Sequence, residues 1–209
     1  MFERARYFPR EGYISMPWRN GAGTTREIAR APATGESFAW RLSLATLETS
    51  GPFSSYPGYH RVVALVDGDG FRLNTAGSAA MELTVPGDHA LFQGAAETHC
   101  ELLNGPCTDL SLMVREPGKI ASVVRTRVAA EQLVSVPEGR IQAIFVMRGA
   151  VNCRAIESSP PAAALRGQSY RLNVNDTLLI PGCGSVWSIC PASSEITESL
   201  LLSFSQQDL

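Results

Sequence analysis

Turn-forming residues recur along this chain at intervals too short for most helices, and this spacing constrains the fold more than any other feature. Glycine tolerates positive φ and proline fixes φ, so both residues favour turns. The short segments between the turns are rich in β-branched and aromatic residues, which favour strands. Many short strands at such spacing predict an all-β sandwich or closed barrel. In the first half the turns fall at Gly51-Pro52, Pro57-Gly58, Asp67-Gly68-Asp69-Gly70, Pro86-Gly87-Asp88 and Asn104-Gly105-Pro106.

The expected strands form two series separated by a break at Glu116-Pro117-Gly118. The first series covers residues 24–29, 38–46, 61–66, 70–74, 80–85, 89–92, 98–103 and 109–115. The second covers residues 140–147, 151–156, 169–174, 177–180, 186–190 and 200–204. Helix signals are scarce, and the best of them, residues 128–134, predicts only a turn or two. The segment 158–167 is rich in proline and alanine and predicts a loop.

The two halves of the chain resemble each other. The apolar segments 61–66 and 141–146 each lead into a glycine turn, and each is followed by an Asp-containing stretch that ends on glycine, 83–94 and 172–182. Repetition at this scale predicts two β-barrels in tandem, the double-stranded β-helix or RmlC-like jelly-roll arrangement called a bicupin. The alternative is that β proteins with similar turns look alike by chance.

The break near residue 117 predicts the domain boundary. Residues 1–117 are expected to form an N-terminal cupin barrel that holds the candidate ligand pocket. Residues 118–209 are expected to form a C-terminal cupin barrel that serves packing or dimerisation.

Charge and hydropathy exclude several classes of partner. The chain has 18 Lys and Arg against 20 Asp and Glu, a net charge of −2, whereas nucleic-acid binding favours a clustered basic surplus. No apolar run approaches the ~20 residues that span a bilayer. The first residues lack the apolar core of a signal peptide. We therefore expect a cytoplasmic protein with neither nucleic acid nor membrane as a partner.

Cysteine and histidine spacing predicts neither a metal nor another cofactor. The five cysteines form no Cys-x-x-Cys pair, and an odd number without a secretion signal fits reduced thiols. The three histidines, His60, His89 and His99, lack the close spacing of a cupin metal site. Gly-x-Ser-x-Gly and phosphate-binding glycine motifs are absent from the sequence.

The candidate chemistry lies in polar residues placed inside apolar strands. Strand alternation puts Thr25 and Glu27 on one face of their strand, and Arg41 and Ser43 on one face of the next. Arg41 and Arg61 lie in otherwise apolar strands, where an unpaired charge is costly. Two interpretations stay open. Either Arg41 forms a structural pair, for instance with Glu27, or the guanidiniums bind a small carboxylate at a barrel mouth.

Four runs of the sequence resemble the HutD/Ves family, and the resemblance is densest over residues 16–115. The runs are Trp18-Arg-Asn-Gly-Ala-Gly-Thr-Thr-Arg-Glu-Ile28, Trp40-Arg-Leu-Ser43, Pro52-Phe-Ser-Ser-Tyr-Pro-Gly58 with Arg61, and Asp109-Leu-Ser-Leu-Met113. The chain departs from the family pattern at Ala22, where a third glycine is common, and at Ser111, where an asparagine is expected.

The resemblance implies a bicupin protein. HutD members are encoded with the bacterial histidine-utilisation enzymes, so it also implies a metal-free accessory or regulatory protein of histidine catabolism. The implied ligand is a small carboxylate metabolite such as N-formylglutamate, formiminoglutamate or urocanate. No established catalytic activity comes with the family, and no catalytic residue is assigned. The motifs carry over as ligand-binding candidates Asn20, Thr25, Glu27, Arg41, Ser43 and Arg61.

Two other functions compete with the regulatory one. The first is a metal-independent cupin enzyme, an isomerase or hydrolase, in which Glu27 acts as general base. The second is an interaction module that forms a homodimer through strands of the second barrel such as residues 141–147.

Overall fold

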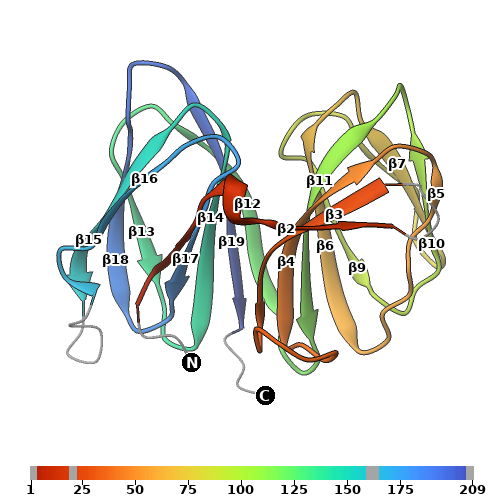
Figure 1. Ribbon diagram of the computed structural model, residues 1–209, viewed down its shortest axis with the longest axis horizontal. Helices are drawn as coiled ribbons and strands as arrows, with labels where there is room; N and C mark the ends of the chain where they lie inside the picture. The colour runs from red at the N-terminus through yellow and green to blue at the C-terminus, as the bar shows by residue number, and fades with distance from the viewer. Residues whose placement is uncertain (1–3, 19–22, 159–164, 206–209) are drawn as a thin grey trace. The chain divides into compact units, whose positions relative to one another are not determined.

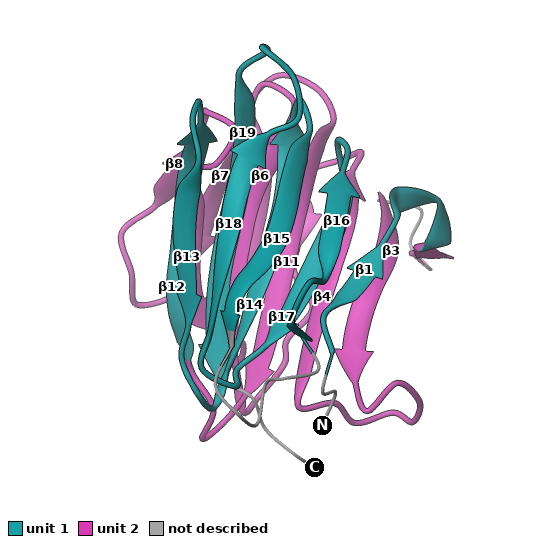
Figure 2. Ribbon diagram, turned by 90° about the vertical axis from the view of Figure 1, so that its left-hand side faces the viewer, with its two compact units in different colours: residues 1–12, 120–208 teal, residues 13–119, 209 magenta. Residues whose placement is uncertain are grey.

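The computed structural model describes residues 4–18, 23–158 and 165–205, and this part of the chain is all-β (Figure 1). It contains strands and a 3-10 turn at Arg10–Gly12, without an α-helix among the described residues. No helix in the described ranges has the length and apolar character that crossing a membrane requires. The chain divides into two units, residues 13–119 and residues 1–12 with 120–208 (Figure 2).

The N-terminal unit consists of two antiparallel sheets that face each other (Figure 1). A six-stranded sheet has the order β2-β3-β4-β11-β6-β9, and a four-stranded sheet has the order β5-β10-β7-β8. Side chains from both sheets, among them Leu65 and Phe71, are fully buried in one core. The strands are β2 (Ile14–Pro17), β3 (Gly23–Ala31), β4 (Trp40–Leu47), β5 (Gly51–Pro52), β6 (Tyr59–Asp67), β7 (Phe71–Thr75), β8 (Met81–Leu83), β9 (His89–Gln93), β10 (Thr98–Leu102) and β11 (Cys107–Arg115).

The other unit is built in the same way from a five-stranded sheet, β1-β17-β14-β19-β12, and a four-stranded sheet, β13-β18-β15-β16. Its core contains Trp187 and Ile144, one from each sheet. The strands are β1 (Arg6–Phe8), β12 (Ile120–Val128), β13 (Gln132–Val136), β14 (Arg140–Arg148), β15 (Val151–Ser158), β16 (Ser169–Leu172), β17 (Thr177–Pro181), β18 (Ser185–Pro191) and β19 (Thr197–Ser205).

Eight strands have the same order in both units. The order β4-β11-β6-β9 corresponds to β12-β19-β14-β17, and β5-β10-β7-β8 corresponds to β13-β18-β15-β16. An irregularity in the strand pairing also recurs. The register shifts at the equivalent point in the β6–β11 pair and in the β14–β19 pair. The sequence repeat at residues 61–66 and 141–146 thus falls on the equivalent strands β6 and β14.

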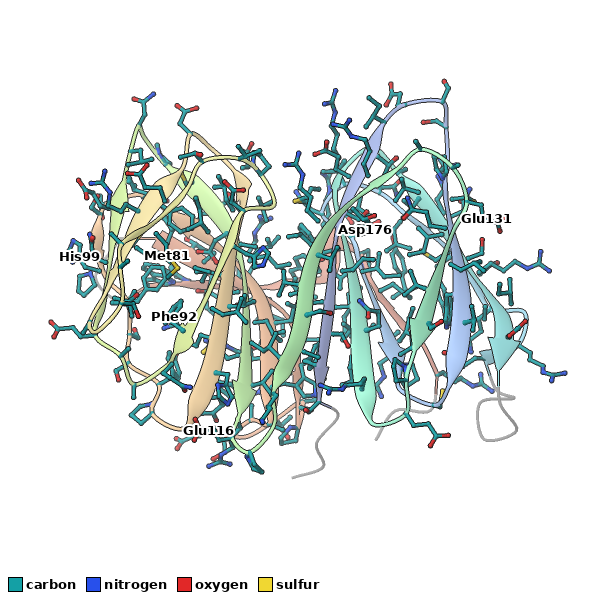
Figure 3. All side chains as sticks on the ribbon, turned by 180° about the vertical axis from the view of Figure 1, so that it is seen from behind. Met81, Phe92, His99, Glu116, Glu131 and Asp176 are labelled. Atoms are coloured by element: carbon teal, nitrogen blue, oxygen red, sulfur yellow. The ribbon has the colours of Figure 1, made fainter. Side chains whose placement is uncertain are left out.

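Residues 1–12 belong to the unit that contains residues 120–208. The expected division at residue 117 had placed them in the N-terminal barrel. Strand β1 pairs with β17. The buried carboxylate of Asp176, labelled in Figure 3, holds the segment by accepting hydrogen bonds from the Tyr7 hydroxyl at 2.8 Å and the Arg10 backbone N–H at 3.0 Å. A three-residue strand anchored by a distant aspartate leaves little signal in the sequence.

The helical turn expected at residues 128–134 is wrong. Strand β12 ends at Val128, and β13 begins at Gln132. The pairing of β12 with β19 and of β13 with β18 supplies backbone hydrogen bonds that a one-turn helix could not match.

The dimer surface expected on residues 141–147 stays a prediction. Strand β14 lies between β17 and β19 at the centre of its sheet, and Ile141 to Val146 are buried.

Candidate functional site

A cavity of about 450 Å³ lies in the N-terminal unit. Strands β3, β4, β6 and β11 supply one wall, and the segment between β5 and β6 supplies another. Its polar lining includes two arginines, one aspartate and three hydroxyl side chains: Arg41, Arg61, Asp109, Thr25, Ser43 and Ser111.

Strand register explains why these polar groups meet. Met113 of β11 pairs with Arg41 of β4 on one side and with Arg61 of β6 on the other. Two residues earlier in β11, Ser111 pairs with Ser43 of β4. Paired residues and alternate residues share one face of a sheet, so the two arginines and the two serines all point to the cavity side.

Arg61 is held in a fixed position inside an aromatic cage. The side chain is 8% exposed, and Nη1 donates a hydrogen bond of 2.9 Å to the Ser54 carbonyl oxygen. Its guanidinium carbon lies 5.2 Å from the ring centroid of Phe53, 5.5 Å from Tyr56 and 5.1 Å from Phe92. Burial lowers the pKa of Arg61, an effect that the nearby Asp109 opposes. The Nε–H has no hydrogen-bond partner among the described residues.

Arg41 is placed similarly but contacts fewer groups. Its Nη2 lies 3.4 Å from the Tyr56 hydroxyl, and its guanidinium carbon lies 5.0 Å from the Phe38 ring centroid. Its Nε is buried, again with no hydrogen-bond partner in the described chain. Arg41 forms no ion pair with Glu27 in the described structure, so the structural-pair interpretation is wrong for these two residues.

Asp109 is the charged residue of the cavity that the sequence did not place in the candidate site. It is 1% exposed, and its Oδ1 has no hydrogen-bond partner in the described part of the chain. Burial raises the pKa of Asp109 to about 7, and Arg61 only partly offsets this rise. Strand alternation could have found it, because Asp109, Ser111 and Met113 occupy one face of β11.

The structure brings together four of the six candidate residues. Thr25, Arg41, Ser43 and Arg61 all line the cavity. Thr25 Oγ1 accepts a hydrogen bond of 2.8 Å from Trp18 Nε1. Glu27 pairs in register with Ser43 but is not among the residues that line the cavity. Asn20 lies outside the described residues. That any of these side chains binds a ligand remains a prediction.

The described histidines are not arranged as a metal site. His99 is exposed and points away from the strands (Figure 3), and His60 Nε2 lies 3.8 Å from Glu116 Oε1. Within the described ranges, no group of three or more His, Cys, Asp and Glu side chains is placed to hold an ion. The expectation of a protein without a metal stays a prediction.

Gly94 fixes the aromatic wall of the cavity. The Tyr56 N–H donates to the Gly94 carbonyl oxygen at 2.7 Å, and the Gly94 N–H donates to the Tyr59 carbonyl oxygen at 2.7 Å. A Cβ at Gly94 would collide with the carbonyl oxygen of Tyr56. The backbone approach therefore requires glycine at this position.

Gly94→Ala is expected to lower the free energy of unfolding by about 1–3 kcal/mol, because the Tyr56 backbone must move to admit the methyl group. Urea denaturation measures this loss. Gly51→Ala is the matched control, since a Cβ at Gly51 meets nothing within 4 Å. Equal stability of the two variants would show that the close approach is not needed.

Comparisons with known proteins agree with this architecture. The HutD family model matches residues 10–196. An uncharacterised 21.2 kDa protein in the hutC 3′ region of Pseudomonas putida is 41% identical over 104 residues, 49% of this chain and 54% of that protein. The chain spans about half the length of the first curated relatives it matches.

Solved structures match over nearly the whole chain. A conserved protein of unknown function from Pseudomonas aeruginosa superposes with a TM-score of 0.83 at 27% identity, covering 97% of this chain and 99% of that one. HutD from Pseudomonas fluorescens gives 0.75 at 26% identity, covering 98% and 100%. Oxalate decarboxylase from Lactobacillus farciminis gives 0.69 at 9% identity over 96% and 86%, a likeness of fold alone. The fold is a cupin jelly roll.

Proposed function

The chain belongs to the HutD family, and on that premise we propose that it is a small-molecule-binding accessory or regulatory protein of histidine catabolism. The proposed ligand is a carboxylate intermediate such as N-formylglutamate or formiminoglutamate. One observation carries this proposal: two guanidiniums line one cavity, and neither forms an ion pair with a carboxylate of the described chain. Family membership supports the link to histidine utilisation.

The chemistry of the cavity fits a small anion. Planar guanidinium groups bind a carboxylate through two parallel hydrogen bonds, and the aromatic rings around Arg61 restrict its motion before the ligand arrives. The volume of about 450 Å³ lies within the usual range for small-molecule sites. Hydroxyl groups of Thr25, Ser43 and Ser111 offer further hydrogen bonds.

The proposal includes a tandem bicupin in which only the N-terminal barrel binds the ligand. The shared strand order and the shared register shift support the tandem arrangement. Matching the shifts places Gln142 where the first unit has Arg61, and Ser199 where it has Asp109. Neutral side chains at these positions cannot neutralise a carboxylate.

Thermal-shift and calorimetric titrations test the proposed function. N-formylglutamate is expected to raise the melting temperature with concentration, because a ligand that binds only the folded state stabilises it. Glutarate has the same two carboxylates without the formamide, and we expect it to bind more weakly. Urocanate and formiminoglutamate complete the series. Absence of binding by all four at millimolar concentration would refute the proposed function.

One observation favours an enzyme as the second candidate. A general base needs a pKa near the working pH, and Asp109 has a pKa of about 7 inside the cavity. Glu27, the general base expected from the sequence, does not line the cavity. Chromatography of the same incubations would detect a product, and turnover lost in Asp109→Asn would favour the enzyme.

A further inference from the structure

We propose that Asp109 determines ligand specificity. When an anion occupies the arginine end of the cavity, the carboxyl group of Asp109 takes up a proton and donates a hydrogen bond to a carbonyl oxygen of the ligand. The proposal rests on the proposed function, since it assigns a role within the same site. It narrows the ligand to carboxylates that also carry a neutral carbonyl acceptor, such as a formamide or an amide.

The position of Asp109 supports a contact with a ligand. Its side chain lines the cavity and is 1% exposed, and Oδ1 lacks a hydrogen-bond partner among the described residues. The residues paired with it across the sheet, Ala45 and Leu65, offer no polar side-chain group. Leaving a buried carboxyl oxygen without a partner is costly. A ligand that fills the cavity can supply that partner.

Four charged or titratable side chains from other elements lie near Asp109. Arg41 of β4, Arg61 of β6 and Tyr56 of the preceding loop line the same cavity, and Cys100 of β10 interacts with Asp109 from the other sheet. Burial raises the pKa of Cys100 to about 12, so its thiol stays neutral. Arg61 is the cation that favours an ionised Asp109, and burial opposes ionisation more strongly.

Binding of an anion changes this balance in one direction. A carboxylate held by Arg61 neutralises the cation that favours ionised Asp109, and it brings a second negative charge close to the carboxyl group. Both effects raise the pKa of Asp109, so the complex holds it protonated. A protonated carboxyl group has one O–H donor, which suits a carbonyl oxygen. A cationic amidine would have the opposite effect and would displace the proton.

The experiment measures proton uptake and pH dependence in the full-length protein. N-formylglutamate is titrated at pH 6 and pH 8 in two buffers of different ionisation enthalpy. We expect close to one proton taken up per ligand at pH 8. We also expect affinity to fall about tenfold from pH 6 to pH 8, because free Asp109 has a pKa of about 7. The ligand carboxylates are ionised at both pH values.

Two variants separate the donor role from other roles. Asp109→Asn keeps a neutral hydrogen-bond donor, so we expect it to bind N-formylglutamate at both pH values with neither proton uptake nor pH dependence. Asp67→Asn removes an exposed carboxylate of β6, and we expect it to behave like the wild type. At pH 6, glutarate should bind more weakly than N-formylglutamate, and by the same factor in the wild type and in Asp109→Asn. The reason is that glutarate offers no carbonyl acceptor beyond its carboxylates.

The outcomes distinguish the two proposals. No binding of N-formylglutamate by the wild type would overturn the proposed function together with the role of Asp109. Binding by the wild type without proton uptake would overturn only the role of Asp109, and this result does not depend on any variant folding. Binding lost in Asp109→Asn but kept in Asp67→Asn would also overturn it, because the carboxylate would then accept a ligand N–H.

Discussion

Arg61→Ala is expected to weaken binding of N-formylglutamate by about ten- to one hundredfold. A charge-assisted hydrogen bond contributes ~1.5–3 kcal/mol, which corresponds to one or two powers of ten in the dissociation constant. The loss should be large because Arg61 is buried, is fixed by the Ser54 carbonyl oxygen and is surrounded by three aromatic rings. Little of the binding energy is then spent on ordering the side chain.

Calorimetry of matched variants checks this result. Arg72→Ala is the control, because Arg72 is an arginine of the same unit that does not line the cavity and pairs with Glu82 and Glu101. Arg61→Lys keeps the positive charge but loses the planar guanidinium group with its paired N–H donors, so we expect an intermediate affinity for N-formylglutamate. If Arg61→Ala binds as tightly as Arg72→Ala, the carboxylate does not bind at Arg61.

Strand alternation was sufficient to place most of the candidate site. Arg41 and Ser43 share a face because they are two positions apart in one strand, and Arg61 lies on the cavity side with Val63. The alternation of side chains between the two faces of a strand depends only on local backbone geometry, so it does not depend on what the strand packs against. The turn residues likewise located the central strands, among them β6 and β14.

The aromatic wall could not be assigned in the same way. Phe53 and Tyr56 belong to a loop whose position depends on Gly94, about forty residues further along the chain. Alternation along β11 places Asp109 on the cavity face with Ser111, but its burial and raised pKa depend on packing that the sequence does not show. Glu27 immediately precedes a β-bulge, which bends its strand locally and is invisible in a period-two pattern.

Short edge strands were the other features that the sequence did not reveal. Strands β1 and β2 lie at sheet edges and contain few buried side chains, so they lack an alternating apolar pattern. Strand β12 is also an edge strand, with most of its residues partly or fully exposed. These strands form through pairing with distant segments, and local propensity is a weak guide to such pairing.

Asp109 is expected to make the folded protein less stable as the pH rises from about 4 to about 7. Burial raises the pKa of Asp109 from 3.8 to about 7. Across this range the folded state keeps a proton that the unfolded chain releases, so the free energy of unfolding falls with rising pH and levels off above pH 7. A rise of this size in the pKa corresponds to about 4 kcal/mol.

Chemical denaturation of wild type and Asp109→Asn at pH 4, 6 and 8 measures this effect. The asparagine cannot ionise, so we expect its stability relative to the wild type to increase by about 4 kcal/mol between pH 4 and pH 8. Other titrating groups contribute equally to both proteins and cancel in the difference. The Asp67→Asn control, with an exposed carboxylate removed, should show no comparable increase. Parallel stability curves for wild type and Asp109→Asn would mean that the carboxyl group titrates as it does in water. The buried, unpartnered oxygen would then have a polar partner in solution, and the cavity would need no carbonyl group to satisfy it.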